Sequence, residues 1–158
     1  MPSFSIWVDA DSCQSKARNI LLNTAVKYNI PVFYVANRPI PFSIESTLFK
    51  MIVCEKKKDE ADSYIEEHCS LNDITITRDL LLAQKLLKKE STAINDRGII
   101  FTQKTLEKML KERELSMQMA ALGIRNGKSF GTYTSADLEN FSKTLARLVQ
   151  EKQITVNL

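Results

Sequence analysis

The sequence predicts an α/β fold with a mainly parallel central sheet and a helical extension at its C-terminal end. Short apolar segments alternate with helical segments through residues 1–102, an order that is typical of sheets built from parallel strands. Residues 103–158 instead carry two long patterns of helical spacing. At 158 residues the chain has the length of one ordinary domain. We therefore expect a single domain over residues 1–158, with an α/β core at 1–102 and an extension at 103–158.

The predicted strands are short segments, rich in apolar and β-branched residues, that end at turn-forming or acidic residues. Pro31 stands at the start of the second strand, where its missing backbone donor costs no ladder hydrogen bond. Residues 37–41 contain two prolines and break the chain, and we assign no helix to the connection that follows. The strand segments are residues 4–9, 31–36, 48–54, 74–77 and 92–95, with a further extended segment at 99–102.

The predicted helices are identified by apolar residues that recur three or four positions apart. The first begins at Ser12, a suitable N-cap residue, and ends near Tyr28. The last opens on Thr134–Asp137, a capping-box pattern. Its apolar stripe consists of Leu138, Phe141, Leu145, Leu148 and Val149. Further helices are predicted at residues 59–68, 80–87 and 103–122, and the glycine-containing segment 123–131 is a predicted loop.

Composition and charge exclude several classes of protein. The apolar content of 44% is enough for a full core and excludes a wholly disordered chain. There is no apolar run of membrane-spanning length and no signal peptide, which predicts a soluble, cytoplasmic protein without a membrane partner. The odd number of cysteines and their spacing argue against a disulfide framework and a structural zinc site. A homo-oligomer is compatible with the sequence.

Aspartates at the ends of predicted strands are the most informative feature of the chain. Asp9 and Asp11 follow the first strand, and Asp79 follows the fourth. Asp59 and Asp62 open the second helix. The active crevice of an open parallel sheet lies outside the carboxyl ends of its strands, so these side chains are expected to meet at one rim. Carboxylates that close to one another must take up protons or hold a cation.

The aspartates suggest a shared site for Mg²⁺ or Mn²⁺, the ions that such hard oxygen ligands suit. Because side chains alternate along an extended chain, Asp9 and Asp11 are predicted to point to the same side. Asp59 and Asp62 lie one helical turn apart. A divalent ion can activate water and stabilise charge in phosphodiester hydrolysis. The alternative is a set of unrelated helix caps and surface groups, since aspartate is common at strand ends.

Basic and amide side chains lie beside these acids along the sequence. They would suit a polyanionic substrate whose phosphates contact both the metal and the cations. The alternative is that they are solvated surface residues and turns. The predicted nucleic-acid-binding residues are Asn37, Arg38, Lys57, Lys58, Arg78 and Arg97.

Several segments together form a recognisable set of motifs: Val8–Cys13, Val35–Asn37, Asp59–Ile65, Ile76–Ala83 and Arg97–Gly98, with further agreement at Gly127 and Asp137–Leu145. This set resembles the signatures of the YaiI/YqxD family of small bacterial proteins. The resemblance covers nearly the whole chain, and the family is similar in pattern to PIN-like nuclease domains. It implies a PIN-like three-layer sandwich that binds Mg²⁺ or Mn²⁺ and cleaves RNA or DNA.

The resemblance also implies a ligand set. Metal ligation falls on Asp9, Asp11, Asp59, Asp62 and Asp79, and catalysis falls on the same residues without Asp59. In this scheme Asp9 and Asp79 hold the metal. Asp11 and Asp62 complete its shell or orient the attacking water.

The sequence departs from the family pattern in the loops beside these acids. Gln14 and Lys58 stand where the family has proline and glycine, and the segment from Asp79 to Ala83 lacks the family's proline. Asp96 also replaces a proline, and we do not count it among the ligands. All the implied ligands are retained, so the departures concern the shape of the loops.

Three functional hypotheses follow. The first is a metal-dependent nuclease or phosphodiesterase that acts on RNA or DNA, with RNA favoured. The second is a non-catalytic RNA-binding or regulatory protein with a PIN-like fold, which salt-sensitive RNA binding without cleavage would identify. The third is a phosphatase that uses Asp9 as nucleophile and Asp11 as acid and base, because both follow the first strand as a D-x-D step.

Overall fold

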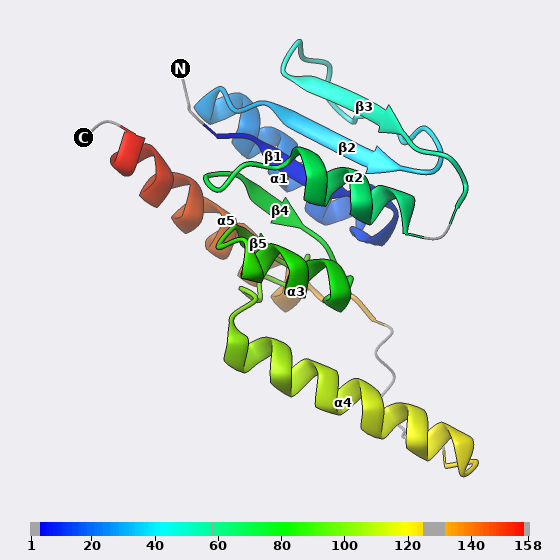
Figure 1. The fold of residues 1–158 in the computed structure, drawn as a ribbon. Helices are drawn as coiled ribbons and strands as arrows, with labels where there is room; N and C mark the ends of the chain where they lie inside the picture. Colours follow the sequence, from blue (N-terminus) through cyan, green and yellow to red (C-terminus); the bar gives the residue numbers. More distant parts are fainter. Residues whose placement is uncertain (1–3, 58, 125–131, 157–158) are drawn as a thin grey trace.

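The predicted α/β fold is confirmed by the computed structural model, which describes residues 4–57, 59–124 and 132–156. Its centre is a five-stranded sheet in the order β3-β2-β1-β4-β5, in which every strand pair is parallel (Figure 1). The carboxyl ends of all the strands therefore lie along one edge of the sheet. The strands are β1 (Ile6–Asp9), β2 (Val32–Ala36), β3 (Phe49–Val53), β4 (Ile74–Ile76) and β5 (Thr92–Ile94).

Helices cover both faces of the sheet and make a three-layer sandwich, consistent with a PIN-like fold (Figure 1). Helices α1 and α5 pack on one face, and α2 and α3 pack on the other. Helix α4 packs beside α3 with its N-terminal half and extends away from the sheet with its C-terminal half. The helices are α1 (Ser15–Tyr28), α2 (Glu60–His68), α3 (Leu80–Lys88), α4 (Gln103–Ala121) and α5 (Ser135–Val156).

Strand β1 is buried on both sides because both faces of the sheet are covered. Ile6 and Val8 join the core with α1 and α5, whereas Trp7 joins the core with α2 and α3. The Trp7 ring stacks on Phe33 at a centroid distance of 4.3 Å, and its Nε1 donates a 2.9 Å hydrogen bond to the buried carboxylate of Asp73. The central strand is thus fixed on both faces, and its carboxyl end is held in a defined position.

The end of the chain packs onto this core as its sequence predicts. Thr134 and Asp137 exchange backbone-to-side-chain hydrogen bonds of 2.9 and 3.1 Å, which confirms the capping box. The predicted stripe of α5 is buried from Phe141 to Val149, and Leu138 at its start is half-buried. Of the predicted loop 123–131, residues 125–131 lie outside the described residues.

The predicted start of the first helix is wrong. Residues Ala10–Ser12 form a short 3-10 turn, and α1 begins only at Ser15, with Gln14 at the N-cap position. The Ser12 hydroxyl donates to the carboxylate of Asp9 at 3.0 Å instead of capping the helix. A hydroxyl beside a buried carboxylate satisfies it by hydrogen bonding, and that local pairing competes with helix capping.

None of the helices in the described ranges has the length and apolar character needed to cross a lipid bilayer.

Gly98 allows the turn after β5 to lie against α5, and its replacement by alanine is expected to destabilise the protein. Its φ is +81°, and an added Cβ would stand 2.5 Å from the backbone oxygen of Asn140. Because a backbone atom cannot move aside as a flexible side chain can, we expect Gly98→Ala to lower the free energy of unfolding by about 2 kcal/mol or more. Urea denaturation measures this. Gly123→Ala, which has a similar φ but open space around it, separates the backbone strain from the clash.

Candidate metal centre

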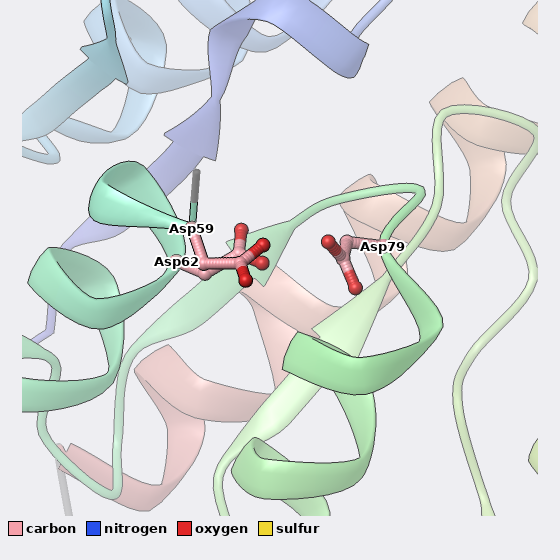
Figure 2. A group of neighbouring side chains, drawn as sticks. All are labelled: Asp59, Asp62 and Asp79. Atoms are coloured by element: carbon pink, nitrogen blue, oxygen red, sulfur yellow. The ribbon is translucent and has the colours of Figure 1, made fainter. Parts of the chain in front are cut away.

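Three aspartates from two helix N-termini meet at the carboxyl edge of the sheet (Figure 2). One carboxylate oxygen from each of Asp59, Asp62 and Asp79 lies within 4.8 Å of the other two. Two oxygens on opposite sides of one Mg²⁺ ion are about 4.2 Å apart, given Mg–O distances of about 2.1 Å. A limit of 4.8 Å is slightly wider than this, so the three carboxylates could hold a single divalent cation after a small side-chain movement. The predicted meeting of acids at this rim is confirmed for these three residues.

The local backbone conformation determines where each of these three carboxylates lies. Asp59 is the N-cap residue of α2 and has a left-handed backbone with φ 66°, which turns the chain sharply into the helix. Asp62 follows one helical turn later and is only 8% exposed. Asp79 caps α3 through one oxygen, since its Oδ1 accepts from the backbone N–H groups of Leu81 and Leu82 at 2.8 and 3.1 Å.

Crowding of these acids changes their ionisation. Burial, followed by hydrogen bonding and repulsion from Asp79, raises the pKa of Asp62 to about 8. Burial also raises the pKa of Asp79, but the hydrogen bonds from Asp62 and from the start of α3 outweigh it and leave this pKa below its ordinary value. Without a cation, the Asp62–Asp79 pair therefore shares one proton at neutral pH. A divalent cation between the two carboxylates would replace this proton.

Asp9 is hydrogen-bonded to the turn between β4 and α3, which contains Asp79. Its Oδ2 accepts hydrogen bonds from the hydroxyls of Thr77 at 2.9 Å and Ser12 at 3.0 Å. The Thr77 hydroxyl in turn accepts from the backbone N–H of Asp79, and the Ser12 hydroxyl accepts from that of Arg78. Burial is the main cause that raises the pKa of Asp9. Asp9 thus fixes the chain between β4 and α3, although it is not one of the three converging carboxylates.

The extended segment that was predicted to carry both Asp9 and Asp11 ends at Asp9, and the two carboxylates are hydrogen-bonded to different neighbouring segments. The extended backbone ends at Asp9 because residues Ala10–Ser12 turn, so the alternation of side chains along a strand no longer applies. The Asp9 carboxylate accepts a hydrogen bond from Thr77, which follows β4. Asp11 is bonded towards β2, where its carboxylate accepts from the backbone of Asn37 at 3.4 Å and pairs with Arg38 at 3.3 Å.

All five predicted acids nevertheless line one cavity of about 810 Å³ at this edge. Asp9 and Asp11 come from the end of β1, and the three converging carboxylates come from α2 and α3. Glu55 and Glu60 add further acidic side chains to its lining. The cavity is therefore strongly acidic and open to a ligand that brings positive charge or a bound cation.

The predicted nucleic-acid-binding residues differ in how they relate to this cavity. Asn37, Lys57 and Arg78 line it, but Lys57 pairs with Glu55 at 3.3 Å and Arg78 pairs with Asp96.

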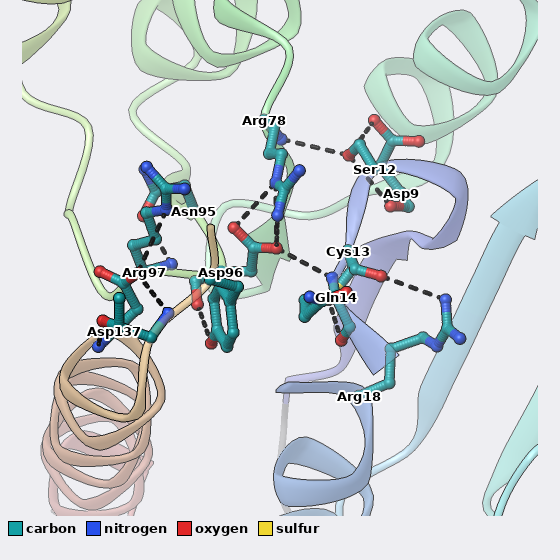
Figure 3. A network of polar contacts seen from close by, with 12 residues as sticks. Asp9, Ser12, Cys13, Gln14, Arg18, Arg78, Asn95, Asp96, Arg97 and Asp137 are labelled. Carbon is teal, nitrogen blue, oxygen red and sulfur yellow. Dashed lines mark hydrogen bonds and ion pairs between the residues drawn. The ribbon is translucent and has the colours of Figure 1, made fainter. Parts of the chain in front are cut away.

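Arg38 is exposed and pairs with Asp11. Arg97 is directed to α5, where it pairs with Asp137 at 3.7 Å (Figure 3). Lys58 lies outside the described residues.

Asp96 ties together the turns around the site, a role that the sequence prediction missed (Figure 3). Its carboxylate is 1% exposed and accepts from the backbone N–H of Gln14 at 2.8 Å. It also accepts three hydrogen bonds from the guanidinium of Arg78, at 2.6 to 3.0 Å. This one side chain therefore joins the segments that follow β1, β4 and β5. The hydrogen bonding to Asp96 is the largest cause that raises the pKa of Arg78.

Arg113 of α4 also lines the cavity and was not predicted. It is one helical turn after Met109 and Leu110, which pack against the core. Residues three and four apart share a face of a helix, so this spacing was a signal that Arg113 lies on the side of α4 that faces the body of the molecule. Arg113 also contributes to the lowered pKa of Asp79.

Comparison with known proteins places the chain in a family. The family described as "Uncharacterized BCR, YaiI/YqxD family" matches residues 7–151. The chain belongs to this family. The match extends over all five candidate acids and over Arg113.

Relatives within the YaiI/YqxD family match over almost their entire length. A UPF0178 protein of Psychromonas ingrahamii is 32% identical over 153 residues, which cover 96% of this chain and 99% of that protein. A UPF0178 protein of Treponema denticola is 35% identical over 144 residues, covering 91% and 90%. One from Legionella pneumophila is 32% identical over 149 residues, covering 94% and 99%. No solved structure matches the chain.

Proposed function

We propose that this protein is a divalent-metal-dependent nuclease or phosphodiesterase that acts on RNA or DNA. The observation that carries the proposal is the convergence of Asp59, Asp62 and Asp79, whose oxygens lie within 4.8 Å of one another inside a cavity open to ligands. Carboxylates that close are stable only with a shared proton or a shared cation. Their all-oxygen donor set suits Mg²⁺ or Mn²⁺.

In this proposal the aspartates have distinct roles. Asp59, Asp62 and Asp79 hold the cation directly, and Asp9 and Asp11 complete the acidic lining from the end of β1. Asp9 also positions Asp79 through the Thr77 hydroxyl. The bound cation supplies Lewis acidity and an activated water. Because Asp62 holds a proton near neutral pH in the absence of the cation, cation binding releases that proton.

The preference for RNA rests on the resemblance to PIN-like nucleases. A cytoplasmic location belongs to the same proposal and rests on cysteine usage. Cys13, Cys54 and Cys69 are all free thiols in the structure, as proteins of a reducing compartment usually have them.

Metal binding and cleavage test the proposal together. We expect Mn²⁺ to raise the melting temperature of the wild type and to allow it to cleave RNA. We expect Asp79→Asn to lose the Mn²⁺-induced shift and to lower the cleavage rate by at least about 100-fold. Glu45→Gln, which also replaces an exposed carboxylate by an amide, should keep both properties. A wild type without any Mn²⁺-induced shift would refute the metal site.

The same measurements separate the other two hypotheses. RNA that binds in a salt-sensitive manner but stays intact with Mn²⁺ would identify the non-catalytic alternative. The phosphatase hypothesis is less compatible with the site. The Oδ2 of Asp9 accepts two hydroxyl hydrogen bonds, which occupy its lone pairs and make this oxygen a poorer nucleophile.

A further inference from the structure

Arg113 differs from the other cations of the acidic cavity because it attracts Asp79 only from a distance and forms no ion pair with a described residue. Lys57 pairs with Glu55 at 3.3 Å, and Arg78 pairs with Asp96. Arg113 makes no ion pair or hydrogen bond with any residue in the ranges 4–57, 59–124 and 132–156. Its guanidinium is exposed and lines the same cavity as the converging aspartates. It is therefore ready to bind an anion that approaches those aspartates.

A second cavity, of about 430 Å³, continues from the acidic cavity along α4. Arg78, Leu80 and Arg113 line both. Beyond them the second cavity is lined mainly by apolar side chains, which include Met109 and Met117. Its volume falls in the range of sites for small organic groups, roughly 300–1,000 Å³. A ligand that fits both cavities would therefore place an anionic group beside Arg113 and an apolar, flat or flexible group next to it.

The C-terminal half of α4 keeps an apolar surface in solvent. Met117 is 63% exposed, and no charged residue occurs from Leu115 to Ile124. Met109 and Leu110 pack against the core on the same face of the helix that carries Arg113 and Met117. The face of α4 that is buried in the first half of the helix thus continues in the second half as the lining of a groove, which is the second cavity. Methionine side chains are flexible and make favourable sulfur–aromatic contacts, so they suit the face of a nucleobase.

We propose that Arg113 and the groove beside it bind the nucleotide next to the scissile phosphate of a nucleic-acid substrate. Arg113 contacts the phosphate, and Met109 and Met117 contact the base. This inference rests on the proposed function, because it extends the same site from the metal ligands to the substrate. The charge of Arg113 is complementary to a phosphate, and the groove is continuous with the acidic cavity. Since a base can present its face to the groove only when it is unpaired and unstacked, the substrate is single-stranded at that nucleotide.

Binding of a short oligonucleotide measures the role of Arg113. We expect Arg113→Ala to weaken binding of an oligonucleotide of about eight nucleotides by roughly tenfold at low salt and to reduce the salt-dependence slope by about 1. The probe is an oligouridylate in Ca²⁺ in place of Mn²⁺. Lys111→Ala removes the same charge from the opposite side of α4, and it should change binding by less than about twofold. Equal effects of the two substitutions would overturn the proposed phosphate contact.

A chain without bases tests the groove. We compare the oligonucleotide with an abasic chain of the same length, which carries the same phosphates. The wild type should bind the chain with bases at least about fivefold more tightly, in line with the energy of sulfur–aromatic contacts. Met117→Glu should lose this preference, whereas Met117→Leu should keep most of it. Arg113→Ala should weaken both chains equally. A wild type that binds both chains equally would overturn the base contact.

Failure of this inference can be told apart from failure of the proposed function. If the wild type shows no Mn²⁺-induced thermal shift, the metal site itself fails. If Arg113→Ala and Met117→Glu keep that shift and also keep the wild-type affinity for the oligonucleotide, only the further inference fails. Light scattering adds one more decisive outcome. A wild-type dimer that Met117→Glu converts to monomer, with unchanged affinity for the oligonucleotide, would assign the groove to a second copy of this chain and overturn the nucleotide site.

Discussion

Asp62→Asn is expected to stabilise the metal-free protein at about pH 8 while it abolishes Mn²⁺ binding. The physical reason is that burial and the neighbouring carboxylates disfavour the ionised form of Asp62. Burial and the nearby Asp79 carboxylate raise the pKa of Asp62 to about 8. An asparagine at this position is neutral at every pH and can still donate a hydrogen bond to Asp79. The variant therefore keeps the contact and loses the charge.

The sign of the pH dependence follows from the two states of Asp62. In the unfolded chain Asp62 ionises near its ordinary pKa of 3.8, but in the folded protein it keeps its proton up to about pH 8. A raised carboxyl pKa favours the folded state at low pH, and this contribution is lost as pH rises from about 4 to about 8. Asp79, whose pKa is lowered, acts in the opposite sense only below about pH 4.

Thermal melts at two pH values measure this effect. Below about pH 4 the wild type and Asp62→Asn should melt at similar temperatures, because Asp62 is then largely neutral in both the folded and the unfolded state. At about pH 8 the variant should be more stable by about 2 kcal/mol, after allowance for the water of the open cavity. That difference is equivalent to roughly 4–8 °C for a domain of this size. Parallel melting curves of the two proteins across this pH range would contradict the raised pKa.

With Mn²⁺ present, the wild type should become more stable than Asp62→Asn. The wild type gains stability as RT ln(1 + [Mn²⁺]/Kd), about 2.7 kcal/mol at a concentration one hundred times Kd, whereas the variant gains little. Because the cation must displace the proton of Asp62, the apparent affinity of the wild type should increase with pH up to about 8. Glu45→Gln should follow the wild type throughout. If Asp62→Asn kept the Mn²⁺-induced shift, Asp62 would not be a ligand.

The fold and the position of the site could be predicted from the sequence because both follow from local patterns. Apolar strands that alternate with helices determine a parallel sheet, and a parallel sheet brings the ends of its strands to one edge. That rule was enough to place Asp9 and Asp79 at the same cavity, although they are far apart in the chain. The predicted proximity of Asp59 and Asp62 is likewise found, although Asp59 is the N-cap residue that precedes α2, so the left-handed turn at Asp59 and not the helix sets its position.

The finer geometry was not predictable in the same way, because it depends on turns and on packing between distant segments. The 3-10 turn after β1 separates Asp11 from Asp9, and a strand pattern contains no signal for the residue at which the strand ends. The cavity position of Arg113 depends on how α4 lies against α3. Arg97 and Arg78 have similar sequence surroundings, each beside an aspartate. The tertiary fold directs Arg97 to Asp137 and brings Arg78 to the cavity.

Asp96→Ala is expected to be strongly destabilising, although Asp96 is not a metal ligand in the proposal. Its buried carboxylate accepts a hydrogen bond from the Gln14 backbone and three from Arg78. Removal leaves the Gln14 N–H without its acceptor and breaks charged hydrogen bonds, which are worth about 1.5–3 kcal/mol each in net stability. Arg78 is 48% exposed and can be hydrated after the loss, which reduces the cost. We expect a loss of about 3 kcal/mol in the free energy of unfolding.

Asp11→Ala provides the matched control, because it also removes an aspartate that pairs with an arginine. The Arg38–Asp11 pair lies at the surface, with the Arg38 side chain 68% exposed, so its loss should cost no more than about 0.5 kcal/mol. Urea denaturation at one pH compares the two variants directly. Asp96 also holds the segment that precedes Asp79, so Asp96→Ala should weaken Mn²⁺ binding without removing a ligand. Similar unfolding midpoints for the two variants would mean that the hydrogen bonds of Asp96 do not stabilise the turns around the site.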